Sequence, residues 1–171
     1  MLSIKKSKRF FVIAIPLLLL LSCGQMDNKQ TTIDKKEIQG TTIEVDISNK
    51  NTLAILLAKD GTINRKGSAL ADSTDNDLFM GVTNEKVFDS LMETVSDDLL
   101  SYSNKANPFC DTAKQTCRVK ISFVSNTSER TIDYCVKGTM NDLPAPIKEY
   151  IDNAIKITGS WYQTQKNLIK K

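Results

Sequence analysis

Residues 41–48 read TTIEVDIS, and apolar and polar side chains alternate along them. The apolar positions and the polar positions between them are Ile43, Val45 and Ile47, and Thr42, Glu44 and Asp46. Successive side chains of a strand point to opposite faces, so this period of two predicts a strand with one buried face. We therefore interpret the neighbouring segments as further parts of a sheet.

The segment that follows, LAILLAKDGTINRKGS (residues 53–68), predicts a hairpin. Its Asp60-Gly61 pair is a strong signal for a two-residue turn, and it separates an apolar run from a shorter polar strand. The run from Leu53 to Ala58 is apolar on both faces, which places it centrally in a sheet. Residues 69–82, which contain ADSTDNDLFMG, predict a loop.

Residues 84–103 predict an amphipathic helix, with Thr83 or Asn84 as its N-cap. Its apolar side chains recur three or four residues apart: Phe88, Leu91, Met92, Val95, Leu99 and Tyr102. Residues 117–124 and 130–137 alternate as residues 41–48 do, so they predict a second hairpin.

The C-terminal segment predicts a second helix, because Pro146 suits a first helical turn and an apolar stripe follows it. The stripe consists of Ile147, Tyr150, Ile151, Ala154, Ile155, Thr158, Trp161 and Tyr162. Gly159 is expected to end or kink this helix.

The expected order of elements is β-ββ-α-ββ-α. Strands and helices in separate runs favour an α+β fold. We expect a mostly antiparallel sheet, built from two hairpins and an N-terminal strand, with two amphipathic helices on one face. Residues 41–171 have the length of a single globular domain.

The N-terminus has the parts of a secretory signal: basic residues within positions 5–9, an apolar run from Phe10 to Leu21, and the small residue Ser22. A helix over that run would be about 18 Å long, against a hydrocarbon core of about 30 Å. A permanent transmembrane helix is therefore disfavoured.

The residues Leu20-Leu21-Ser22-Cys23 resemble the lipobox of bacterial lipoproteins, in which an aliphatic residue and a small residue precede an obligatory cysteine. The resemblance is confined to this N-terminal segment. It implies a signal peptide over residues 1–22, cleavage between Ser22 and Cys23, and a covalent lipid on the Cys23 thiol that contacts the membrane. Residues 23–40 then form the lipidated cysteine and a flexible, polar tether.

Gly24 follows the cysteine, in the place where enteric lipoproteins retained in the inner membrane carry aspartate. By that analogy the protein is expected in the cell envelope, at the outer membrane and facing the periplasm.

Removal of the signal changes the charge of the chain. The full sequence has 23 basic and 20 acidic residues, but four of the basic residues and none of the acidic ones lie in residues 1–22. The mature chain then has 19 basic against 20 acidic residues, a net charge of −1. A slightly acidic chain does not indicate a nucleic-acid partner.

Three cysteines remain in the domain: Cys110, Cys117 and Cys135. An oxidising compartment predicts one disulfide and one unpaired thiol. Strand parity puts Cys117 and Cys135 on opposite faces, which disfavours their pairing. We favour Cys110–Cys117 with Cys135 unpaired, and Cys110–Cys135 is the alternative.

The sequence lacks the residues that most catalytic and metal sites use. It contains no histidine, which removes Ser-His-Asp and Cys-His arrangements and most transition-metal sites. The loop DSTDND (residues 72–77) fails the EF-hand register, because its sixth and twelfth positions are Asp77 and Thr83 instead of Gly and Glu. We expect no metal, no catalytic residue and no cofactor other than the lipid.

Two apolar pairs are candidates for partner contact. Phe79-Met80 is either an exposed contact or the anchor of its loop in the core. Trp161-Tyr162 is an aromatic pair of a kind common at interfaces. The simpler expectation for that pair is that Trp161 fills the core and Tyr162 lies at its margin.

Three hypotheses for function follow. The first is a lipid-anchored binding or accessory protein that acts through contacts with another envelope protein. The second is a periplasmic inhibitor or immunity-type protein that neutralises a toxin or hydrolase. The third, an envelope hydrolase, requires a histidine-free mechanism such as paired carboxylates or Ser-Lys, and it is the least favoured.

Overall fold

The computed structural model describes residues 33–70, 75–111 and 116–169. The predictions for residues 1–22 and Cys23, including the lipobox and its cleavage site, lie outside the described residues.

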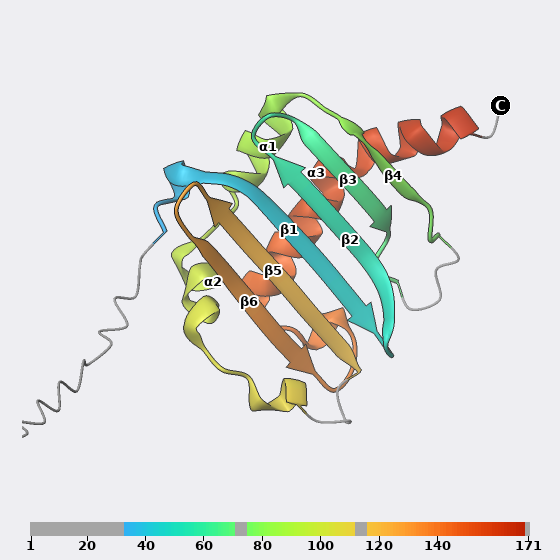
Figure 1. Ribbon diagram of the computed structural model, residues 1–171. Coiled ribbons are helices and arrows are strands. Elements are labelled where there is room, and N and C mark those ends of the chain that lie inside the picture. Colours follow the sequence, from blue (N-terminus) through green and yellow to red (C-terminus); the bar gives the residue numbers. More distant parts are fainter. Residues whose placement is uncertain (1–32, 71–74, 112–115, 170–171) are drawn as a thin grey trace, which may run out of the picture. The chain divides into compact units, whose positions relative to one another are not determined.

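The described residues form one six-stranded sheet in which every neighbouring pair is antiparallel (Figure 1). The strand order is β4-β3-β2-β1-β5-β6. The strands are β1 (Ile38–Ile47), β2 (Lys50–Ala58), β3 (Thr62–Gly67), β4 (Leu78–Val82), β5 (Cys117–Ser125) and β6 (Glu129–Val136). The N-terminal strand β1 lies between the two predicted hairpins, and the predicted α+β class is confirmed.

Tight turns fix the register on one side of β1. Ser48 and Asn49 connect β1 to β2 with φ angles of 51° and 61°, and Gly61 turns β2 into β3 with a φ of 88°. Positive φ at both central residues is typical of the hairpin turns that match strand twist. The hairpin predicted at Asp60-Gly61 is present, because β2 and β3 pair antiparallel, but three residues, 59–61, connect its strands instead of two, and of these only Gly61 has a positive φ.

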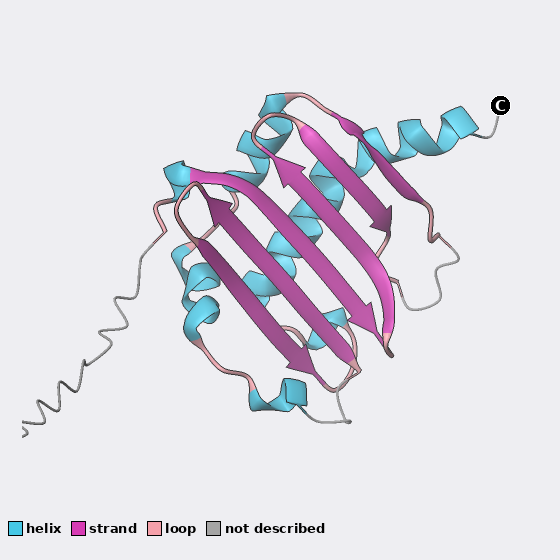
Figure 2. Ribbon diagram, in the orientation of Figure 1, coloured by secondary structure: helices cyan, strands magenta, loops and turns pink. Residues whose placement is uncertain are grey.

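The helices cover one face of the sheet and leave the other face open (Figure 2). They are α1 (Glu85–Met92), α2 (Asp97–Ser101) and α3 (Ala145–Ile169). The core lies between sheet and helices, and its fully buried members include Ile43, Leu57, Ile121, Leu91 and Ile147. We call the sheet face away from the helices the open face.

The helix predicted over residues 84–103 is in fact two helices. Asn84 caps α1, as predicted, but α1 ends at Met92. The Ser96 hydroxyl accepts a hydrogen bond from the Leu99 backbone N–H at 3.0 Å, which makes it the N-cap of α2. A serine followed by two acidic residues starts a helix more readily than it continues one.

The domain begins earlier than residue 41, so the predicted tether is too long. A 3₁₀ turn forms at Lys35–Glu37, and β1 starts at Ile38. Ile33 and Ile38 are 6% and 1% exposed. These two residues are apolar positions in an otherwise polar stretch, and burying them adds residues 33–40 to the fold.

Residues 78–82, predicted as part of a loop, form β4 against β3. At the other end of the chain, α3 continues through Gly159 without ending there. Glycine costs a helix about 1 kcal/mol relative to alanine. The buried residues on both sides of it, Thr158 and Tyr162, fasten the helix to the sheet and offset that cost.

Candidate protein-binding edge of the sheet

The two outer strands of the sheet, β6 and β4, differ in how they are covered. Beside β6 lies a 3₁₀ turn, η3 (Pro108–Asp111), which a disulfide between Cys110 and Cys135 joins to the strand. The Asn107 side chain also donates a hydrogen bond to the Cys135 carbonyl at 3.1 Å. A covered edge of this kind is protected against pairing with another chain.

This pairing corrects the favoured prediction of Cys110–Cys117 with Cys135 unpaired. In the register of the hairpin, Cys117 lies opposite Val136 while Cys135 lies opposite Arg118, so the two cysteines face opposite sides of the sheet, as strand parity predicted. The prediction failed because the loop carrying Cys110 folds over the open-face side of β6. Cys117 is the buried free thiol instead, and burial raises its pKa to about 11.

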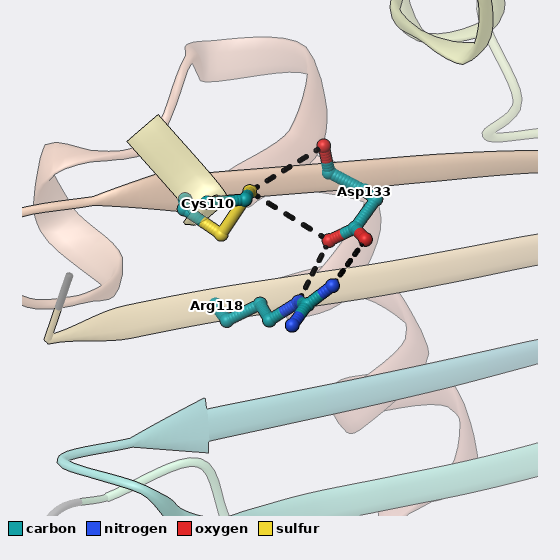
Figure 3. Close-up of polar contacts among 4 residues, drawn as sticks. Cys110, Arg118 and Asp133 are labelled. Atoms are coloured by element: carbon teal, nitrogen blue, oxygen red, sulfur yellow. Dashed lines mark hydrogen bonds and ion pairs between the residues drawn. A yellow bond between two sulfur atoms is a disulfide. The ribbon is translucent and has the colours of Figure 1, made fainter. Parts of the chain in front are cut away.

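The disulfide lies next to an ion pair on the open face (Figure 3). Arg118 holds the Asp133 carboxylate through two contacts of 2.9 and 2.5 Å, and the Cys110 sulfur lies 3.8 Å from the same carboxylate. Potential ligand atoms of Cys110, Asp133 and Cys135 lie within 4.8 Å of one another. Cysteine binds a metal as the thiolate, however, and these two sulfurs are bonded to each other, which leaves Asp133 as the one ligand of this group. The arrangement is a structural link between strands and loop.

The opposite outer strand, β4, has no strand neighbour on its far side within the described residues. Its side chains Leu78, Met80 and Val82 are 57%, 69% and 72% exposed. Between them, Phe79 points to the helix side, where its ring contacts Tyr162, so these three side chains lie on the open face. We call the free side of β4, with these three residues, the β4 edge.

The backbone of β4 also offers hydrogen-bonding groups at this edge. The Thr83 N–H donates to the Gly61 carbonyl at 2.8 Å, on the β3 side. Backbone groups alternate between the two sides of a strand, so Leu78, Met80 and Val82 direct theirs to the free side. The Val82 carbonyl accepts a hydrogen bond there from the Trp161 indole at 3.2 Å.

The structure brings together the two pairs that the sequence suggested for partner contact. The Phe79 and Tyr162 rings pack edge to face with centroids 5.4 Å apart. Phe79 is therefore the anchor of the pair in the core, and Met80 is its exposed member. The expectation for the aromatic pair on α3 is reversed, because Tyr162 is 1% exposed and Trp161 is only partly buried, at the margin beside β4.

A polar cluster that sequence reasoning missed fastens α3 to the start of β4. Lys166 forms an ion pair with Asp75 at 2.8 Å, and the Tyr162 hydroxyl donates to Asp75 at 2.9 Å. Burial alone would raise the pKa of Asp75, but these hydrogen bonds outweigh it and lower that pKa below its usual value. Burial, together with Asp75, raises the pKa of Tyr162 to about 12.

Arg65 belongs to the same cluster, although it is almost completely buried. Its guanidinium donates to the Ile155 carbonyl at 2.9 Å and to the Thr158 hydroxyl at 2.6 Å, and it lies over the Tyr162 ring. Burial lowers its pKa, against the opposing effects of Tyr162 and Asp75. The sequence did hold a signal for this burial. Arg65 stands two residues after Ile63, so the period of two in β3 directs both side chains to the same, inward face.

A hollow of about 310 Å³ near the start of α3 is a weaker candidate for a binding site than the β4 edge. Its lining includes apolar residues together with Lys148 and Asp152, which pair with each other at 2.5 Å. Its volume is at the lower limit for small-molecule sites, and its charged groups are already matched. We therefore place the candidate site at the β4 edge.

The chain matches no protein-family model and no curated protein. Within the part of the chain that the structure describes, no helix is both long and apolar enough to cross a membrane.

Proposed function

We propose that this protein is a lipid-anchored, non-enzymatic binding protein of the cell envelope, and that it binds another protein by adding a strand to the β4 edge. The observation that carries the proposal is an outer strand that, among the described residues, has no strand neighbour on its far side and carries three exposed apolar side chains on one face. Main-chain hydrogen bonds provide affinity in such complexes, and alternate side chains provide specificity.

The composition of β4 supports this role. Outer strands of soluble proteins are commonly protected by charged residues, proline or a covering loop. The five residues LFMGV contain neither a charge nor a proline, whereas β6 carries charged side chains and the disulfide-linked turn. The matching partner segment is extended, with apolar side chains at alternate positions.

The predicted anchor supports a partner close to the membrane. Cys23 precedes the first described residue, Ile33, by ten positions, and ten residues reach at most about 35 Å. A lipid on Cys23 would therefore hold the start of the domain within about 35 Å of the membrane surface, where other envelope proteins are present. This proposal includes the envelope location and the outer-membrane assignment.

Site-specific photo-cross-linking of the full chain in its own membranes tests the proposal. A photoreactive residue at Met80 should form a protein adduct, because this side chain is 69% exposed beside the free strand edge. The matched control is Lys120, an exposed position of β5 on the same open face. Equal adducts at both positions, or none at Met80, would contradict strand addition at this edge. An adduct with a toxin or hydrolase would favour the inhibitor hypothesis over the accessory one.

A further inference from the structure

We infer that the strand added to the β4 edge comes from a second copy of this chain, so that the protein is a dimer with one sheet continuous through both copies. The inference rests on the proposed function, since it names the partner of the same edge. Three properties of the edge carry it: its self-complementary register, its lack of charge, and the projection of α3 beyond it.

An antiparallel pair of identical strands is related by a two-fold axis. With that axis at Met80, the middle residue of β4, Met80 lies opposite Met80 of the second copy and Leu78 lies opposite Val82 of the second copy. These are the residues whose backbone groups point to the free side, so they form the hydrogen-bonded pairs of the new ladder. The Val82 carbonyl has two lone pairs, so it keeps its bond from Trp161 and accepts a second one from the added strand. On the open face, every cross-strand pair is then apolar against apolar.

Charge does not oppose this arrangement. A two-fold axis places each residue near its own counterpart, so any charge at the centre of the strand would meet a like charge. β4 has none. Asp75, a partly buried carboxylate three positions before β4, is already paired with Lys166 at 2.8 Å.

The projection of α3 indicates that the layer of strands continues beyond β4. Figure 1 shows α3 passing behind β4 and out beyond its free edge. The buried stripe of α3 ends at Tyr162, and its helical continuation reaches Leu168 and Ile169, which are 62% and 66% exposed. Seven residues past Tyr162 extend about 10 Å, the width of about two strands. Strands of a second copy fill the space above this segment.

The two-fold axis also relates the two α3 helices. Trp161 donates to the Val82 carbonyl and Tyr162 packs on Phe79, so α3 crosses behind β4 between these two residues. The two-fold axis therefore places the C-terminal ends of the two α3 helices side by side and antiparallel. Leu168 and Ile169 then become buried in the dimer.

A charge-swap experiment tests the inference. Two differently tagged full-length copies are co-expressed, and recovery of one with the other is measured after purification in detergent. Wild-type copies should co-purify, whereas Met80→Lys in both copies, or Met80→Glu in both, should reduce recovery about tenfold or more, because like charges then face each other. Met80→Lys with Met80→Glu should restore it, since each lysine then faces a glutamate.

Val124→Lys in both copies is the matched control, because Val124 is 39% exposed on the open face of β5 and should leave recovery unchanged. Failure of the mixed pair to recover, or full recovery of the two lysine variants, would overturn the dimer. The restored mixed pair also shows that the variants fold. If the dimer fails while Met80 still cross-links to a different protein, the proposed function stands; if Met80 forms no adduct at all, both fail.

Discussion

At the scale of single residues, the orientation of neighbouring side chains decides which of them is buried under β4 and which lies at its edge. Trp161 and Tyr162 are adjacent on α3, where consecutive side chains point about 100° apart. Tyr162 is buried because it meets Phe79, Arg65 and Asp75, and Trp161 is left at the margin with its indole on the Val82 carbonyl. The side chain with a hydroxyl is the one buried, because Asp75 and Gly67 supply its hydrogen-bond partners.

Because of Asp75, the stability of the fold is expected to change with pH in the acid range. Its pKa is lower in the folded protein than in the unfolded chain, so its ionised form stabilises the fold at pH values above about 4, and this contribution is lost as the pH falls further. We expect Asp75→Asn to lower the free energy of unfolding by about 1 kcal/mol at neutral pH and to have a smaller effect near pH 2.

Urea unfolding at several pH values measures this difference. Asp89→Asn, at an exposed position of α1, is the control and should cost less than Asp75→Asn at neutral pH. An equal loss for Asp75→Asn at neutral and acid pH would show that the ion pair does not stabilise the fold.

At the scale of elements, α3 connects the inner strands to the β4 edge. Its buried residues extend from Ile147 to Tyr162 and pass from the middle of the sheet to its outer strand. Along the way Tyr150 bonds to Thr41 on β1, and Arg65 on β3 bonds to Thr158. A helix with contacts along this length positions β4 relative to the inner strands.

Gly159 offers a test of the continuity of α3. A Cβ at this position meets nothing within 4 Å, so Gly159→Ala should raise the free energy of unfolding by about 1 kcal/mol. Gly67→Ala is the contrasting variant, because Gly67 has a φ of +71° and a Cβ there collides with the Thr52 carbonyl. That variant should be destabilised by about 1–3 kcal/mol.

Chemical unfolding followed by circular dichroism distinguishes these outcomes. Loss of stability in Gly159→Ala would mean that the helix is interrupted or bent at this position.

At the scale of the whole molecule, the two outer strands of the sheet differ in how they are covered. The disulfide and η3 cover β6, whereas β4 has no strand neighbour on its far side in the part of the chain that the structure describes. An uncovered apolar edge favours aggregation unless it has a partner. The proposed anchor limits the protein to a surface, where its local concentration, and therefore the occupancy of the edge, is higher than in solution.

The anchor itself is tested at Cys23. Cys23→Ser removes the thiol that the lipobox resemblance assigns to the lipid, so the variant should move from the membrane fraction to the soluble fraction and lose incorporation of a labelled fatty acid. Cys117→Ser is the control, since Cys117 is a buried residue of the core and should leave the protein in the membrane. Membrane retention of Cys23→Ser with undiminished labelling would refute the lipoprotein assignment.

The sequence by itself determined most of the elements of the fold. Strict alternation in residues 41–48 and 117–124 and the Asp60-Gly61 turn each predicted a strand or hairpin that is present. These patterns are local, because the period of a strand and the backbone of a turn depend on residues a few positions apart. The α+β class follows from their order.

Only the tertiary structure decided the candidate site. β4 is five residues long and apolar on both faces, so its strand character comes from pairing with β3. Cys110 finds Cys135 because a loop folds over β6, and Phe79 meets Tyr162 although 83 positions separate them. Contacts between distant parts of the chain depend on how strands and helices pack in space, and no local period records that packing.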